Sequence, residues 1–144
     1  MKNLRKVEVL QNGALHVISN DYGHVSPHYK AFNILKLKDN ITLKNCLLLH
    51  DFINKKLPSS FNNYFTTCED LHSINTRSAS KGHIFAPDVD TVTYGSKSIK
   101  HQAILSYNYL TGLYPEVNFF SMARNKFKKI IKQHFINSYT CITV

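Results

Sequence analysis

Cysteine and histidine side chains occur at spacings that could hold a metal ion in two parts of the sequence. Cys68 and His72 are four positions apart, with His83 further on, and His24 and His28 have the same four-residue spacing. A structural zinc site usually takes four Cys or His ligands, often with a Cys-x2-Cys pair, which this chain lacks. Scattered surface histidines are the preferred interpretation, so we expect no metal site and no cofactor.

Nucleophiles and carboxylates do not combine into a catalytic pattern either. Cys68 or Ser73 could meet His72, but a catalytic triad is assembled in space rather than from sequence neighbours. Asp88 and Asp90 form a tight acidic pair, yet two-metal chemistry needs several carboxylates, and the chain has nine acidic residues in all. A turn is the preferred interpretation of this pair. With no Gly-x-Ser-x-Gly or phosphate-loop motif, we expect no catalytic residue and no independent enzyme.

A dense group of basic residues near the end of the chain offers a different chemistry. Five Lys or Arg side chains occur within nine positions and no acid accompanies them: Arg124, Lys126, Lys128, Lys129 and Lys132. On a helix they would lie behind an apolar stripe and could contact phosphates or an acidic surface. The alternative is a solvated face whose stripe packs on the core. Because opposite faces are involved, both can hold at once.

The overall charge agrees with a polyanionic partner. The formal net charge is +9, with 18 basic and 9 acidic residues. Residues 1–72 carry nine basic and six acidic residues, whereas residues 73–144 carry nine and three. Such an excess favours nucleic acid as a partner, although charge alone supports only non-specific binding.

Composition bounds the class of protein and its compartment. Hydrophobic residues make up 43% of the chain, enough for a core, and no apolar run approaches the roughly 18 residues of a membrane span. The three cysteines are odd in number and far apart, which fits a reducing compartment. We expect an intracellular protein, in the nucleus or cytoplasm, without a secretory signal and without a membrane partner.

Helical periodicity dominates the first part of the sequence. Lys2 to Ser19 predicts an amphipathic helix with apolar residues at three- and four-residue spacing. A connection around Pro27 follows, and residues 30–37 form a short helix or an apolar turn. A second helix is expected from Asp39 or Asn40, as its cap, to Lys56.

The remaining chain alternates irregular and helical stretches. Residues 59–90 lose regular pattern, and 90–100 predict a short β-ribbon turning at Gly95-Ser96. Residues 101–112 and Ser121 to Asn137 are expected to be helices. The predicted fold is mainly α with a small β-ribbon (α+β): about four helices, a long central loop and a short hairpin. We expect one domain, 1–137, in three parts (1–57, 58–92 and 93–137), with a flexible tail at 138–144.

Short motifs in a fixed order resemble a known family. They are Leu10-Gln11-Asn12-x-Ala14-Leu15, Leu35-x-Leu37, Leu57-Pro58-x-x-Phe61, His72-Ser73-x-Asn75-Thr76-Arg77, Gly95-x-x-Ser98-Ile99-Lys100, Tyr107-Asn108 and Phe127-Lys128-Lys129. Along nearly the whole chain, their order is similar to the region downstream of the reverse transcriptase domain in non-LTR retrotransposon polyproteins of the Jockey and chicken-repeat type. Such elements usually have Trp-Asn where this chain has Tyr107-Asn108. This sequence also lacks the catalytic carboxylates of the polymerase and an endonuclease domain.

The resemblance implies a non-catalytic accessory module beside the polymerase thumb that helps to hold RNA or DNA, with the reverse transcriptase domain as a further partner. Arg77 is its candidate contact in the central stretch, although it could instead pair with Asp88 or Asp90. Lys97 and Lys100 could contact phosphate or simply protect a strand edge. The alternative function is a structural or protein-interaction module without nucleic-acid binding. Its contact would use four aromatic residues: Tyr64, Phe65, Tyr107 and Phe119.

Overall fold

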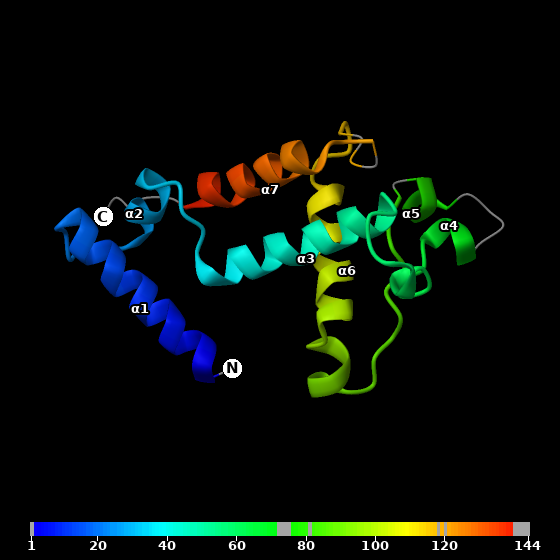
Figure 1. Cartoon of the computed structure of the whole chain (residues 1–144), viewed down its shortest axis with the longest axis horizontal. Helices are drawn as coiled ribbons and strands as arrows, with labels where there is room; N and C mark the ends of the chain where they lie inside the picture. Colours follow the sequence, from blue (N-terminus) through cyan, green and yellow to red (C-terminus); the bar gives the residue numbers. More distant parts are fainter. Residues whose placement is uncertain (1, 72–75, 81, 118, 120, 140–144) are drawn as a thin grey trace. The chain divides into compact units, whose positions relative to one another are not determined.

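Helices dominate the computed structural model, which describes residues 2–71, 76–80, 82–117, 119 and 121–139 (Figure 1). The elements are α1 (Lys2–Ser19), α2 (Ser26–Ala31), α3 (Leu37–Ile53), the 3-10 helix η1 (Ser59–Phe61), α4 (Cys68–Leu71), α5 (Arg77–Ser80), the π-helical turn η2 (Val92–Ser96), α6 (Ile99–Gly112) and α7 (Arg124–Ser138). Two compact units divide the chain. The first comprises Met1–Ile41 with Lys129–Val144, and the second comprises Thr42–Lys128. The expected single domain stays a prediction, and the end of its expected tail, residues 140–144, lies outside the described residues.

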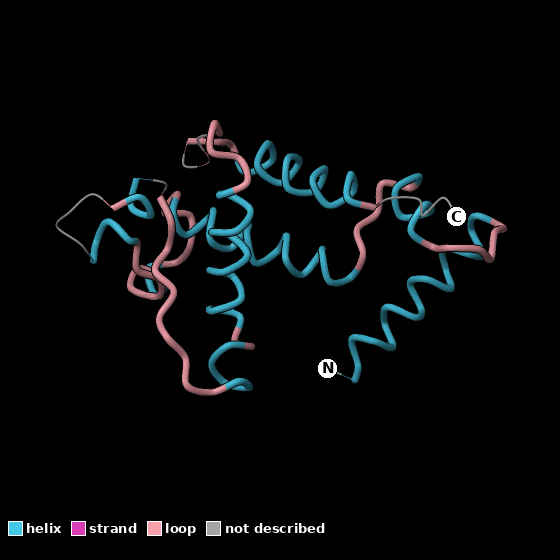
Figure 2. Tube along the Cα trace, turned by 180° about the vertical axis from the view of Figure 1, so that it is seen from behind, coloured by secondary structure: helices cyan, strands magenta, loops and turns pink. Residues whose placement is uncertain are grey.

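The expected β-ribbon is wrong, and with it the α+β class. No strand or sheet occurs in the part of the chain that the structure describes, where Thr67 and Ile84 form an isolated antiparallel bridge (Figure 2). Backbone hydrogen bonds of the supposed ribbon close locally: Gly95 N and Ser96 N both donate to Thr91 O, at 3.1 and 3.0 Å. Donors used within one turn cannot form a ladder between two strands, so the β-branched residues there did not produce a hairpin.

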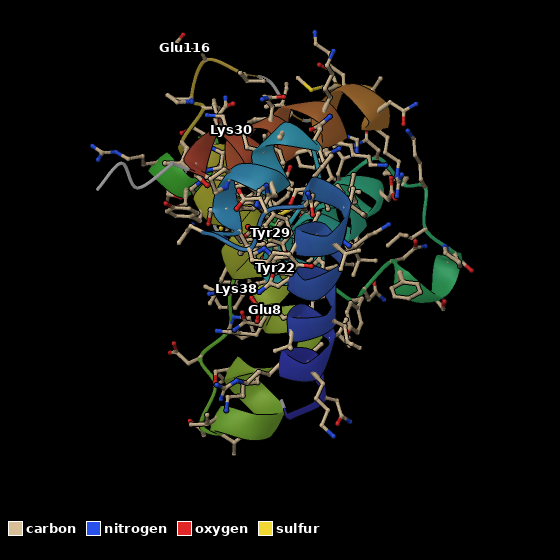
Figure 3. The ribbon with its side chains drawn as sticks, turned by 90° about the vertical axis from the view of Figure 1, so that its left-hand side faces the viewer. Glu8, Tyr22, Tyr29, Lys30, Lys38 and Glu116 are labelled. Carbon is tan, nitrogen blue, oxygen red and sulfur yellow. The ribbon has the colours of Figure 1, made fainter. Side chains whose placement is uncertain are left out.

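The first unit is closed by hydrogen bonds around two buried tyrosines. Tyr29, on α2, is labelled in Figure 3. Its hydroxyl donates to Asn12 Oδ1 on α1 at 2.6 Å. The hydroxyl of Tyr139 donates to Asp39 Oδ2 at 2.5 Å and accepts from Lys36 N at 3.0 Å. Asp39 therefore accepts a side-chain bond instead of capping the helix, which begins earlier, at Leu37. Contrary to expectation, Pro27 is not in a connection but in the first turn of α2, where a missing N–H is tolerated.

Helix α1 confirms the helix predicted from Lys2 to Ser19, but its apolar stripe faces away from its own unit. Leu15 is the one buried apolar residue among the described side chains of α1, at 3% exposure. Polar contacts add to it: Gln11 Nε2 donates to Leu35 O at 2.9 Å, beside the bond from Tyr29. Six aliphatic side chains of α1 are 48–72% exposed: Leu4, Val7, Val9, Leu10, Val17 and Ile18.

The core of the second unit is built on α3 and α6. Buried side chains of α3 include Cys46 and Leu49, and those of α6 include Ile104 and Tyr107. Ser98 begins α6 as its N-cap, because its Oγ accepts from His101 N at 3.2 Å. Burial raises the pKa of the Cys46 thiol to about 12, so this thiol stays protonated and unreactive.

Short helices and local bonds order part of the predicted irregular belt at residues 59–90. The isolated bridge is extended by Phe85 N donating to Thr66 O at 2.8 Å. Asn108 of α6 forms two hydrogen bonds with the same segment. Its Oδ1 accepts from Ile84 N at 3.0 Å, and its Nδ2 donates to Ile84 O at 2.7 Å. The belt is therefore attached to the core through side-chain bonds to its backbone.

Candidate nucleic-acid interface

Helix α7 is fixed by a buried apolar side that begins at its first turn. Phe127 and Ile131, one helical turn apart, are both fully buried. In the second unit, the Phe127 ring stacks on the His50 imidazole at a centroid distance of 4.6 Å and lies 5.4 Å edge-on from Phe119. Residues four apart share one helix face, so these contacts determine which side of α7 is turned outward.

The lysines of α7 occupy the opposite side, which we call the basic face: Lys126, Lys128, Lys129 and Lys132. The first three are exposed, and Lys132 is half-buried. Within the described residues, none of the four has a carboxylate within 4.0 Å. The sequence of α7 contains no acid, so the positive charge of this face is not neutralised from within the helix.

Arg124 differs from the lysines because it is already paired. Its Nε donates to both oxygens of Asp51, at 2.8 and 3.0 Å, and the two residues belong to the second unit. Arg124 is 45% exposed and Asp51 is 16% exposed, so the pair adds little stability of its own but orients the first turn of α7. Among the predicted contact residues, Arg124 is therefore the one tied to a carboxylate.

The other predicted residues lie apart from α7 in the sequence and have different surroundings. Arg77 is the exposed first residue of α5, after Thr76, whose Oγ1 accepts from Ala79 N at 3.2 Å. No ion pair joins Arg77 to Asp88 or Asp90 in the described part of the chain. The Thr-Arg pair thus starts a short helix and leaves the arginine in solvent.

Lys97 and Lys100 cannot protect a strand edge, because this region has no strand among the residues described. Lys97 follows the π-helical turn and is exposed. Lys100 is in the first turn of α6, with its Nζ 4.9 Å from the centroid of the Tyr64 ring. That contact is a cation–π arrangement, and it places a positive charge beside an aromatic surface.

The four aromatic residues expected to form a protein-contact surface do not form one. Phe65, Tyr107 and Phe119 are 4%, 1% and 4% exposed, so these three form core rather than surface. Tyr64 alone of the four is exposed, at 40%. A protein-interaction module stays a prediction, but it would need a different surface.

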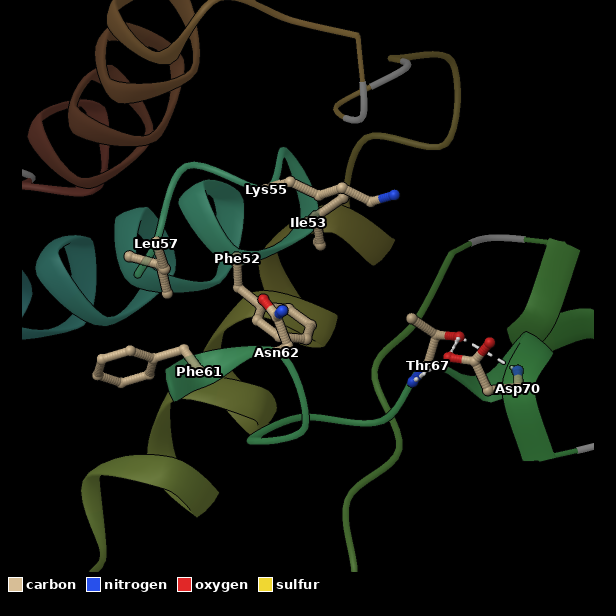
Figure 4. Close-up of a pocket in the computed structure, with 8 residues that line it drawn as sticks. All are labelled: Phe52, Ile53, Lys55, Leu57, Phe61, Asn62, Thr67 and Asp70. Carbon is tan, nitrogen blue, oxygen red and sulfur yellow. Dashed lines mark hydrogen bonds between the residues drawn. The ribbon is translucent and has the colours of Figure 1, made fainter. Parts of the chain in front are cut away.

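A cavity of about 570 Å³ lies in the second unit where α3 ends (Figure 4). Its lining residues are Phe52, Ile53, Lys55, Leu57, Phe61, Asn62, Thr67 and Asp70. No motif in the sequence predicted this cavity. The mixture of Phe, Asn and Lys around residues 52–62 is common in ordinary turns and does not mark a cavity.

Metal and catalytic chemistry gain no further candidates. No group of three or more His, Cys, Asp or Glu side chains is placed to hold a metal ion within the described residues. His72 entered both the metal and the nucleophile hypotheses, and Ser73 entered the nucleophile hypothesis. Both residues lie outside the described residues, as does Cys141. Across the described helices, none has the length and apolar character needed to cross a membrane.

Comparison of this chain with protein-family models, with curated proteins and with solved structures finds no match.

Proposed function

We propose that this chain is a non-catalytic module that binds RNA or DNA through contacts between the basic face of α7 and backbone phosphates. The observation that carries the proposal is a set of exposed lysines, Lys126, Lys128 and Lys129, opposite a fully buried apolar side and without a carboxylate partner among the described residues. Phosphate contacts of this kind supply most of non-specific nucleic-acid affinity. The resemblance to the region downstream of a retroelement reverse transcriptase supports the same function and suggests the polymerase domain as a neighbouring partner.

The buried apolar side of α7 holds the basic face in a fixed orientation. Phe127 and Ile131 fix the rotation of α7, so the lysines project from a helix that need not order itself on binding. A pre-ordered helix avoids the entropy loss that a disordered basic tail incurs when it binds. The net charge of +9 adds long-range attraction to any polyanion.

Salt dependence of binding tests the proposal. The full chain is titrated into labelled single-stranded RNA and into duplex DNA at several salt concentrations, with fluorescence anisotropy as the readout. Replacing Lys126, Lys128 and Lys129 by Gln should reduce the slope of log affinity against log salt by about 2 for the single strand, since each phosphate contact contributes about 0.7.

A charge-matched control separates this face from bulk charge. The exposed lysines Lys6, Lys30 and Lys44 are replaced by Gln, which removes the same charge elsewhere. We expect the control to keep most of the slope. An equal loss in both variants, or no binding at low salt, would contradict the proposal.

A further inference from the structure

The cavity at the end of α3 is lined by both apolar and polar side chains. Phe52 and Phe61 supply two half-buried rings, and Leu57 adds an aliphatic wall (Figure 4). Asn62 and Lys55 are exposed at its border. Aromatic rings next to exposed amide and ammonium groups suit an aromatic ligand that carries hydrogen-bonding groups on its edge.

The two cavity rings belong to a larger aromatic cluster. The Phe52 ring lies edge-on to Phe65 at 5.0 Å, and Phe61 lies edge-on to Tyr64 at 5.6 Å. Tyr64 and Phe65 contact each other at 4.9 Å, which closes the cluster. Because Phe65 is buried, the rings at the cavity are held by the core and do not depend on a ligand for their positions.

Positive charge lies both at the cavity and beside the aromatic cluster. Lys55 lines the cavity, and Lys100 Nζ lies over the Tyr64 ring. Asp70 also lines the cavity, and its Oδ2 accepts from Thr67 Oγ1 at 2.6 Å. A carboxylate held in this way repels a phosphate from the interior, so an anionic ligand would keep its charge outside and insert an uncharged part.

We propose that this cavity takes an unpaired nucleobase of a single-stranded nucleic acid whose phosphates contact the surrounding lysines. The inference rests on the proposed function and adds the strand type that the chain selects. Stacking on the half-buried Phe61 ring would hold the base, because every nucleobase has a π-face. The Asn62 amide would pair with donors and acceptors on the base edge.

The cavity and the first turn of α7 both belong to the second unit. Asp51 of α3 holds Arg124 at the start of α7, and Phe52 of the cavity is the next residue of α3. Lys126 is exposed in that first turn. Paired bases in a duplex cannot enter the cavity without unstacking, so a duplex would gain only the phosphate contacts.

The test compares a labelled single strand with the duplex of the same sequence, using the full chain. Phe61→Leu removes the flat ring but keeps an apolar side chain. We expect it to weaken single-strand binding about tenfold, leave duplex binding unchanged and leave the salt slope unchanged. The matched control is Phe32→Leu, an aromatic 41% exposed in the first unit, which should change neither affinity.

A second variant guards against a folding defect at Phe61. Asn62→Ala alters an exposed side chain, and we expect it to reduce the differences in affinity among single strands of different base composition. Equal affinity for single strand and duplex would overturn the base-binding inference, and so would unchanged single-strand affinity in both variants. If the salt slope were still steep in either case, the proposed function would stand. An absence of binding at low salt would overturn both.

Discussion

At the scale of single residues, His50 is the polar group on which the core of the second unit depends. Its Nε2 donates to Met122 O at 3.0 Å, and its ring, fully buried, stacks on Phe127. Its Nδ1 lies 3.9 Å from Asp51 Oδ1, a carboxylate that Arg124 already pairs. Burial lowers the pKa of His50, with Lys56 acting in the same direction and the Met122 carbonyl and Asp51 opposing it.

Acid should therefore destabilise the protein through His50. Because its folded pKa lies below its unfolded value, the unfolded chain takes up the proton first, and stability falls as the pH drops below about 6.5, by up to about 1.4 kcal/mol per unit. Urea unfolding on both sides of that pH measures the loss. His50→Leu should lower overall stability but shrink its pH dependence, whereas exposed His24→Gln should keep the dependence of the natural chain. An undiminished dependence in His50→Leu would contradict this account.

At the scale of elements, two glycines have opposite roles. Gly13 is inside α1, and a Cβ there would meet no atom within 4 Å. Gly13→Ala should raise the free energy of unfolding by about 0.5–1 kcal/mol, because alanine loses less backbone entropy on forming a helix.

At Gly95 a Cβ would lie 2.7 Å from Val89 Cβ. Gly95→Ala should therefore destabilise the chain; chemical denaturation of both variants checks the signs, and a stabilising Gly95→Ala would disprove the close packing.

The same scale shows which elements can be predicted from sequence. Periodicity predicted α1 to the residue and α7 to within a few positions, since both depend on a repeated apolar spacing. The prediction of a β-ribbon was wrong because Thr and Val residues indicate only a preference for extended backbone. A sheet also needs a partner strand. The capping signals of α4 and α5, Thr67 with Asp70 and Thr76, were present but were not recognised within a loop-like composition.

Site prediction divides in the same way. The basic face follows from spacing alone, because lysines behind an apolar stripe must face outward. The pairing of Arg124 with Asp51 joins residues 73 positions apart, and the cavity is formed by side chains of several elements. Such contacts depend on the packed structure, so no local pattern in the sequence could have revealed them.

At the scale of the whole molecule, charge repulsion should limit stability at low ionic strength. The net charge of +9 repels itself, and the Debye length falls from about 30 Å at 0.01 M salt to about 8 Å at 0.15 M. Over this range, added sodium chloride should raise the melting temperature, as followed by circular dichroism at the helical signal. Lys126, Lys128 and Lys129 replaced together by Gln should show a smaller rise. A melting temperature that falls with salt would mean that ion pairs outweigh the repulsion.

The outward apolar stripe of α1 has a consequence for the motions of the chain. Since Leu15 is the buried apolar contact of this helix, separating α1 from its unit exposes little new hydrocarbon surface to water. Its opening free energy should be a small fraction of that for global unfolding. Amide hydrogens of α1 would then exchange with solvent deuterium by local opening, while those of α3 would wait for the whole core to unfold.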